Sequence, residues 1–331
     1  MTQPGTGVFT YVNYGKEATP GTPVAPTRQF YVDGVAVLQI ERGQNYHEAE
    51  NTGRKFRTRR VTQTTEDVNI SLKTPTGVSF DDLEFPFSFL NGAATGVGGA
   101  ADKLWTQTPS ATALQAPKYF SMDIGDDVQN WRAQYAGCRS FKISAGIGDV
   151  TQLEMDMFAQ RALKVAKATP AINAGPKIPS DLWTIKFATS FAGLPGASVV
   201  TSFLQSFELQ INTGLKPRHY LSGNLYFDQV VETDIGGTLN LTVESTAQAV
   251  TQFYDKSAAD TMDFIRLRAQ GGALGGTNYS SQIDLAVLYE EPEIIAENDD
   301  GVNMYKVTAH IADDGTSSII PLTTNSLAAL P

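Results

Sequence analysis

The feature that most constrains this chain is a two-residue alternation of apolar and other side chains, which recurs along most of the sequence. Successive side chains of a β-strand point to opposite faces, so this period predicts strands with one buried face. Gly, Pro, Asn or Asp turn signals bound each segment. The ten segments are residues 35–40, 68–72, 140–145, 152–158, 183–187, 207–211, 239–243, 264–268, 282–288 and 304–311. The sequence therefore predicts a mainly β fold.

Helical periodicity is confined to two stretches of the chain. Residues 79–90 have Ser79 as a capping residue, and Pro86 limits the length of any helix there. Residues 245–257 form the second stretch, with apolar residues on one face. We expect one short helix in each half of the protein.

Composition narrows the classes of protein that fit. Of the 331 residues, 41% are hydrophobic and 18% charged, which suits a globular protein with a large core. The net charge of −10 argues against a protein that grips nucleic acid by neutralising phosphates. A single cysteine, Cys138, excludes an intrachain disulfide and a thiolate metal site. No apolar run approaches the roughly 20 residues that a membrane-spanning helix needs.

An internal repeat divides the sequence. Residues 38–40 (LQI) recur as residues 209–211, an offset of 209 − 38 = 171, and residues 68–72 (VNISL) match residues 239–243 (LNLTV) at the same offset. The spacers, residues 41–67 and 212–238, are too long for tight turns, so we expect long hairpins or loops that project from the sheet. Chance agreement between generic strands is the alternative to duplication.

The repeat leads to a division into tandem β-sandwich or barrel-like domains, each with a short helix and a projecting hairpin. A Pro- and Gly-rich bridge in the middle of the sequence reads as a linker. The predicted segments are an extended N-terminal arm (1–29), a first β domain (30–168), a linker (169–181), a second β domain (182–317) and a C-terminal tail (318–331).

Two segments are candidates for contacts between subunits or between rings of subunits. Pro20, Pro23 and Pro26 favour an extended arm over a helix or a central strand, with a disordered leader as the alternative. The first spacer holds a basic run in an acidic chain. It reads as a solvated hairpin arm, a nucleic-acid patch, or a surface that docks on acidic groups of another copy. The cationic candidates are Arg54, Lys55, Arg57, Arg59 and Arg60, with Lys216 and Arg218 in the second spacer.

No constellation of catalytic or ligand-binding residues emerges. The three histidines, His47, His219 and His310, lack metal-ligand spacing, and Cys138 has no histidine near it in sequence. Acidic turns such as Asp313-Asp314-Gly315 read as hairpin turns and lack the ligand pattern of a calcium loop. We therefore expect no enzyme activity, no cofactor and no metal.

Three segments resemble the tail tube proteins of tailed bacteriophages. Residues 15–27 (GKEATPGTPVAPT) are similar to the run that precedes the first strand in that family. Residues 135–141 (YAGCRSF) resemble a strand entry further along, and residues 206–212 (SFELQIN) resemble the strand that opens the second half. Outside the matched strands the two halves differ, so their loops need not be equivalent.

The resemblance implies a virion structural protein, assembled in the host cytoplasm, whose rings stack into a tube for genome ejection. Family members with one such domain usually form hexameric rings, so a chain with two implies a trimer. The implied partners are further copies of the chain, other tail proteins at the tube ends, and DNA that passes without sequence-specific binding. The alternative function is a β-sandwich virion module that binds a host receptor or glycan, for which Trp105, Trp131 and Trp183 would converge on one groove.

Overall fold

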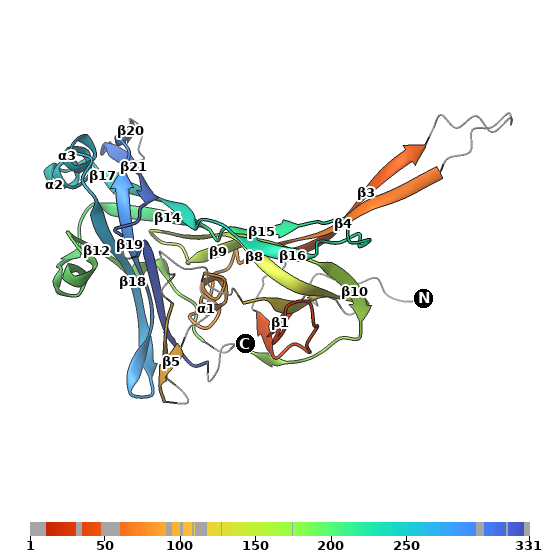
Figure 1. The fold of residues 1–331 in the computed structure, drawn as a ribbon. Helices are drawn as coiled ribbons and strands as arrows, with labels where there is room; N and C mark the ends of the chain where they lie inside the picture. Colours follow the sequence, from red (N-terminus) through yellow and green to blue (C-terminus); the bar gives the residue numbers. More distant parts are fainter. Residues whose placement is uncertain are drawn as a thin grey trace.

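The computed structural model describes residues 11–30, 35–47, 60–90, 95–99, 102–107, 109, 118–126, 128–173, 175–295, 301–315 and 317–327. Strands dominate these residues (Figure 1), so the predicted mainly β fold is confirmed. All ten segments predicted as strands lie within strands of the structure. No helix among the described residues has the length and apolar character to cross a membrane.

Among its described residues, the first half of the chain forms eleven of the strands and one helix. These elements are β1 (Tyr11–Lys16), β2 (Arg28–Phe30), β3 (Val35–His47), β4 (Arg60–Lys73), α1 (Glu84–Phe87), β5 (Thr95–Gly98), β6 (Lys103–Thr106), β7 (Phe120–Gly125), β8 (Asn130–Gly146), β9 (Gln152–Ala159), β10 (Arg161–Val165) and β11 (Ala171–Ile172).

The second half of the chain begins with the short 3-10 helix η2 (Ser180–Leu182). Its elements continue with β12 (Trp183–Ala188), the 3-10 helix η3 (Phe191–Gly196), β13 (Val199–Val200), β14 (Leu204–Asn212), β15 (Leu215–Arg218), β16 (Gln229–Glu232), β17 (Gly236–Glu244), α2 (Ala247–Ala249), the π-helical turn η4 (Val250–Tyr254), α3 (Asp255–Ala258), β18 (Asp263–Leu274), β19 (Thr277–Tyr289), β20 (Glu293–Ile295), β21 (Met304–Ile311) and β22 (Ile319–Asn325).

Both predicted helical stretches contain helix, but the first is shorter than expected. Ser79 Oγ accepts a hydrogen bond from the backbone N–H of Asp82, as a capping residue does, yet the α-helical residues are only Glu84–Phe87. In the second stretch the continuous segment α2–η4–α3 is capped by Thr246, whose side chain accepts from the N–H of Ala249.

One long strand, β8, belongs to two layers of the fold. Its first half pairs with β7 and β10, and its second half pairs with β9 and β14. The second layer is a wide antiparallel sheet in the order β3–β4–β9–β8–β14–β17–β21–β20. Helix α1 lies between the layers, where the ring of Phe85 contacts those of Tyr14, Phe89 and Phe120. This aromatic cluster is the centre of the core in the first half of the chain.

The predicted terminal segments differ from the structure. Strand β1 lies inside the N-terminal arm expected at residues 1–29, and it is hydrogen-bonded to both β2 and β7. Strand β22 lies inside the tail expected at residues 318–331, between β19 and β6. Both strands fill positions in the sheets that would otherwise be open edges. The two-residue pattern did not predict these strands, because β1 is buried on both faces and Pro321 interrupts β22.

The expected linker is folded against the first half of the chain. Strand β11 runs parallel to β2, and Ile178 is fully buried beside Val78, whose carbonyl accepts its N–H. The pairing of β8 with β14 joins the two halves in one continuous sheet. The division into two domains with these boundaries stays a prediction.

Candidate assembly interface

The two halves of the chain repeat one pairing scheme. In the first half, β1 pairs with β2 and β7, β3 with β4, β4 with β9, and β8 with β7, β9 and β10. The second half repeats these pairings in the same chain order, with the strands β12, β13, β14, β17, β18, β19, β21 and β22. Strand β20 follows β19 in the chain and also pairs with β21. The β5–β6 hairpin is inserted in the first half and the β15–β16 hairpin in the second. The sequence repeat therefore corresponds to a repeat in topology.

Each half has a buried ion pair between the corresponding strands β7 and β8 or β18 and β19. The acidic residue is on the first strand in one half and on the second strand in the other. Asp123 on β7 lies opposite Arg132 on β8, and the guanidinium Nε and Nη2 donate to its two carboxylate oxygens at 2.6 and 2.9 Å. Arg266 on β18 lies opposite Asp284 on β19 in the same bidentate geometry, with both distances 2.7 Å. The same arrangement with opposite polarity indicates that the halves share architecture although most side chains differ.

The junction between the halves is an antiparallel pairing of β8 with β14. Residues 140–146 lie opposite residues 206–212. On one face, Lys142 Nζ lies 3.5 Å from Glu208 Oε2 across the junction and 3.4 Å from Glu154 Oε2 on β9, while Lys73 Nζ reaches Glu154 Oε1 at 3.1 Å. Main-chain pairing and the Lys142–Glu208 ion pair thus join the two repeats.

The wide sheet ends in two strands that each have one neighbour. Within the described residues, β3 pairs only with β4, and β20 pairs only with β21. Strand β3 corresponds to β14 by the sequence repeat. Strand β20 pairs with β21 as the second half of β8 pairs with β9, and β21 is the counterpart of β9, so β20 corresponds to the second half of β8. The two open edges are therefore the counterparts of the two strands that meet at the junction.

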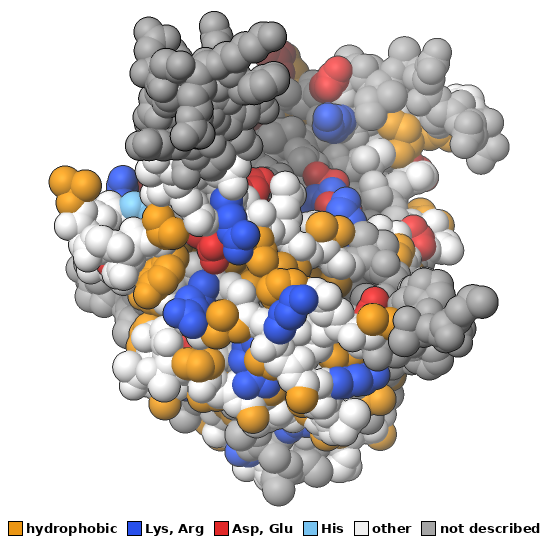
Figure 2. Space-filling model, turned by 90° about the vertical axis from the view of Figure 1, so that its right-hand side faces the viewer, with side chains coloured by type: hydrophobic (Ala, Val, Ile, Leu, Met, Phe, Trp, Pro, Cys, Tyr) orange, Lys and Arg blue, Asp and Glu red, His pale blue; other side chains and the backbone are white. Residues whose placement is uncertain are grey.

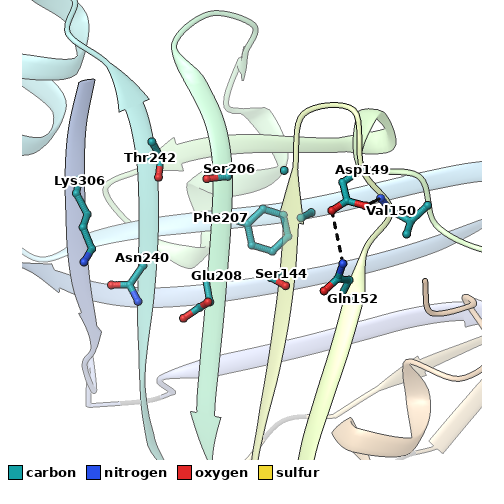
Figure 3. Close-up of a pocket in the computed structure, with 12 residues that line it drawn as sticks. Ser144, Asp149, Val150, Gln152, Ser206, Phe207, Glu208, Asn240, Thr242 and Lys306 are labelled. Carbon is teal, nitrogen blue, oxygen red and sulfur yellow. Dashed lines mark hydrogen bonds between the residues drawn. The ribbon is translucent and has the colours of Figure 1, made fainter. Parts of the chain in front are cut away.

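One face of this sheet is polar over five of its strands. Lys306, Asn240, Glu208, Ser144 and Gln152 follow one another across five neighbouring strands (Figure 3). A hollow of about 390 Å³ lies on this face beside the β8–β9 turn, with Asp149 and Glu208 among its lining residues. The alternate residues, such as Leu209 and Leu241, are buried in the core. Hydroxyl, amide and charged groups make up the polar face.

The candidate prolines lie in a loop that folds back on its own chain. Pro20 and Pro23 are exposed, whereas Pro26 is buried. The buried Glu17 carboxylate holds this loop: it accepts from the backbone N–H of Gly21 at 2.7 Å, from Ser121 Oγ at 2.8 Å and from the N–H of Tyr135 at 2.8 Å. These contacts lie within one chain; contacts of the prolines with another chain stay a prediction.

Most of the basic run lies outside the described residues. Arg54, Lys55, Arg57 and Arg59 fall there, and Arg60 begins β4. The β3–β4 hairpin itself projects from one end of the molecule (Figure 1), as expected for the first spacer.

The second spacer instead folds over the base of the β3–β4 hairpin. Its strands β15 and β16 pair with each other, and the carbonyl of Leu225 accepts from the N–H of Glu66 on β4 at 2.7 Å. Lys216 and Arg218 are both exposed on β15. Lys and Arg side chains are spread among hydrophobic ones over the face at this end of the molecule (Figure 2).

The remaining candidate residues are held apart. His219 lies 3.0 Å from Asp67 and His310 lies 2.6 Å from Glu290, both as exposed pairs, while the side chain of His47 is outside the described residues. Cys138 is buried, and burial raises the pKa of its thiol well above the usual value. Among the described residues, no cluster of three His, Cys, Asp or Glu side chains has the geometry of a metal site.

The three tryptophans also have separate environments. Trp105 Nε1 donates to Asn325 Oδ1, Trp131 lies under Lys164 Nζ, and Trp183 packs against Phe207. None of them is among the described residues that line the hollow on the polar face. The convergence on one groove that a glycan-binding module would need is not found in the described part of the chain.

Sequence reasoning missed a group of buried carboxylates around α1. Asp81 accepts from the N–H and Oγ of Ser326, and Glu84 is hydrogen-bonded to Gln107 Nε2 and Thr323 Oγ1. Burial raises the pKa of Glu84 to about 7, and burial lowers the pKa of the nearby Lys118 to about 8. These groups tie the C-terminal strand of the second half to the helix of the first.

Comparison with known proteins agrees with the architecture. No curated protein matches the sequence. The family model described as phage tail tube protein matches residues 10–311, nearly the whole described chain. A mainly β chain with open sheet edges suits a structural subunit that associates with itself in a virion tail. The chain belongs to the phage tail tube protein family.

Proposed function

We propose that three copies of this chain close into a ring by pairing β20 of one copy with β3 of the next. The observation that carries the proposal is the β8–β14 junction, because the counterparts of its two strands are the two open edges of the sheet. An unpaired edge presents free N–H and C=O groups that favour association with another strand. A head-to-tail interface of this kind gives a ring when the rotation closes.

The internal junction also predicts the register of the interchain pairing. Lys142 lies opposite Glu154 on β9, and Ile295 lies opposite Met304 on β21, so position 295 corresponds to position 142. Lys142 lies opposite Gln210 on β14. The sequence repeat places Gln39 at the position of Gln210. The strand pairing places Glu41 there instead, because Gln210 lies opposite Thr238, Glu41 lies opposite Asp67, and Thr238 and Asp67 correspond by the repeat. Position 295 should therefore lie opposite position 39 or 41.

Three copies supply six repeats, the number that the family resemblance implies for one ring. Closure would join the wide sheets of three chains into one barrel without edges. Its polar face would line the lumen. Lys73 and Lys142 on that face are already paired with carboxylates, so they offer little to a passing phosphate backbone. Such a lumen suits DNA that moves through during genome ejection without being bound.

The same proposal covers the place of the protein in the virion. Rings stacked along their axis would form the tail tube, with other tail proteins at its two ends and with assembly in the host cytoplasm. Nothing in this role requires catalysis, and the candidate residues carry no reaction.

Engineered disulfides test the ring directly. In a Cys138→Ser background, Ile295→Cys combined with Gln39→Cys or with Glu41→Cys should give covalent trimers on a non-reducing gel, because facing residues of antiparallel strands have Cβ atoms about 4.5–5.5 Å apart. Ile295→Cys combined with Ile40→Cys is the matched control, since position 40 faces the opposite side of β3. Native mass spectrometry of the unmodified protein measures the stoichiometry. A monomer at high concentration, or equal cross-linking at position 40, would refute the proposal.

A further inference from the structure

The loop between β15 and β16 holds an apolar tip out in water. Leu221 is fully exposed, and the adjacent Tyr220 is 53% exposed. Exposed large apolar side chains are common singly, whereas here two of them are neighbours at the tip of a hairpin. The tip lies beside the base of the β3–β4 hairpin, where His219 pairs with Asp67.

A carboxylate fixes the conformation of this loop. Asp228 accepts hydrogen bonds from the N–H of Tyr220 at 3.0 Å, from Ser222 Oγ at 2.6 Å and from Asn224 Nδ2 at 3.0 Å. Gln229 Nε2 also donates to the Tyr220 hydroxyl at 2.7 Å. A loop that is rigid before binding loses less conformational entropy when it docks. The chain therefore presents Leu221 in a fixed position, as a docking residue requires.

The β8–β9 turn of the wide sheet offers a complementary surface. Ile147, in the turn between β8 and β9, is 75% exposed. The hollow on the polar face begins at this turn, and two carboxylates, those of Asp149 and Glu208, line it. Lys216 and Arg218 lie on the strand that leads to the Leu221 tip. Apolar groups and opposite charges are thus available at the two ends of each subunit.

Strand direction places these surfaces at opposite ends of the molecule. Strand β8 runs toward the β8–β9 turn, and β14, antiparallel to it, runs away from that turn toward β15. In a closed barrel the strands are inclined to the axis by about 35–45°, so the two ends of a strand face the rings above and below.

We propose that the tip formed by Tyr220 and Leu221 docks on the β8–β9 turn of a second copy of this chain in the adjacent ring. Leu221 packs against Ile147, and Lys216 and Arg218 approach Asp149. The contact rests on the proposed ring but is separate from it, because ring closure uses the β3 and β20 edges and stacking uses the ends of the strands.

Two variants separate the halves of this contact. Leu221→Asp should leave rings intact and raise the concentration at which rings enter tubes by at least about tenfold, which corresponds to about 1.4 kcal/mol for each ring that is added. Ile147→Asp should do the same from the other side. Ile172→Asp, at an exposed apolar position on β11 outside both surfaces, is the control for added charge. Leu221→Ser repeats the first test without a charge.

Mixing purified rings of the two variants gives the sharper result. Rings of the Leu221→Asp variant keep a normal β8–β9 turn, and rings of the Ile147→Asp variant keep a normal tip, so the mixture should form pairs of rings that grow no further. Negative-stain microscopy and mass photometry distinguish single rings, pairs and tubes. Tubes of normal length from either variant, or single rings only in the mixture, would overturn the stacking contact. If the unmodified protein forms no rings, the proposed function fails first.

Discussion

Replacement of Glu84 by glutamine should change how the stability of this protein depends on pH. The Glu84 carboxyl is buried at α1, with Gln107 and Thr323 as hydrogen-bond partners and Lys118 as the nearby charge. Glutamine has nearly the same shape and can accept from Gln107 while donating to Thr323. The substitution therefore removes the ionisation and keeps the packing.

The size of the effect follows from the pKa of this carboxyl. Burial raises the pKa of Glu84 from 4.5 to about 7, and each pKa unit corresponds to about 1.4 kcal/mol. A carboxyl with a raised pKa in the folded state contributes its full stability below pH 4.5 and loses it as the pH rises through 7. The unmodified protein should lose about 3 kcal/mol of unfolding free energy between these limits, and the Glu84→Gln variant should not.

Lys118 acts in a different pH range, so the two groups can be separated. Burial lowers the pKa of Lys118 from 10.5 to about 8, and its contribution to stability therefore rises between pH 8 and 10.5. Urea unfolding at pH 5, 6, 7 and 8, followed by far-UV circular dichroism, measures the Glu84 effect alone. Glu293→Gln, at an exposed position, is the control. Parallel stability curves for the Glu84→Gln variant and the unmodified protein would refute the reasoning.

Two further substitutions test the buried contacts that shape the fold. Glu17→Ala removes the acceptor for the N–H groups of Gly21 and Tyr135, and it should lower the unfolding free energy by about 3 kcal/mol and speed hydrogen exchange at Gly21; unchanged exchange would contradict the role of Glu17. Arg266→Ala leaves Asp284 buried without its bidentate partner, so urea unfolding should show a loss of about 3–5 kcal/mol, and an effect below about 1 kcal/mol would show that Asp284 finds other compensation.

The strands that the sequence predicts are those with one face in the core. Strand β17 shows why, because Leu239, Leu241 and Val243 are buried while the residues between them are not. Strands β1 and β7 are buried on both faces, so their side chains show no alternation. The helix of the first half is short because the chain there makes buried turns around Phe85, a tertiary effect that periodicity does not register.

The candidate assembly surfaces are predictable only in part. The repeat of residues 38–40 and 68–72 identified the strand pairs, but an open edge is a property of strand order, which pairing partners determine. Glu17 illustrates the same difficulty, because its partners Ser121 and Tyr135 are more than 100 residues away in sequence. The fully exposed Leu221 has no signal of its own in sequence, since exposure depends on how the loop is held.

The repeat offers a reason why the two halves could diverge so far in sequence. In a ring of three chains, junctions within a chain alternate with junctions between chains, so corresponding positions serve different purposes.

The internal junction is permanent and carries the Lys142–Glu208 ion pair. The proposed interchain junction must form only on assembly, and there the position of Lys142 is occupied by Ile295 and that of Glu208 by Val37 or Gln39. Val37 and Gln39, the residues at these positions of β3, are exposed in the isolated chain and carry no charge. Without a Lys–Glu pair at these positions, the interchain junction avoids the desolvation penalty that such a pair would bring at each association step. Selection on assembly would therefore keep the backbone scheme of both halves while replacing the residues on the edge that has to remain open until a neighbour arrives.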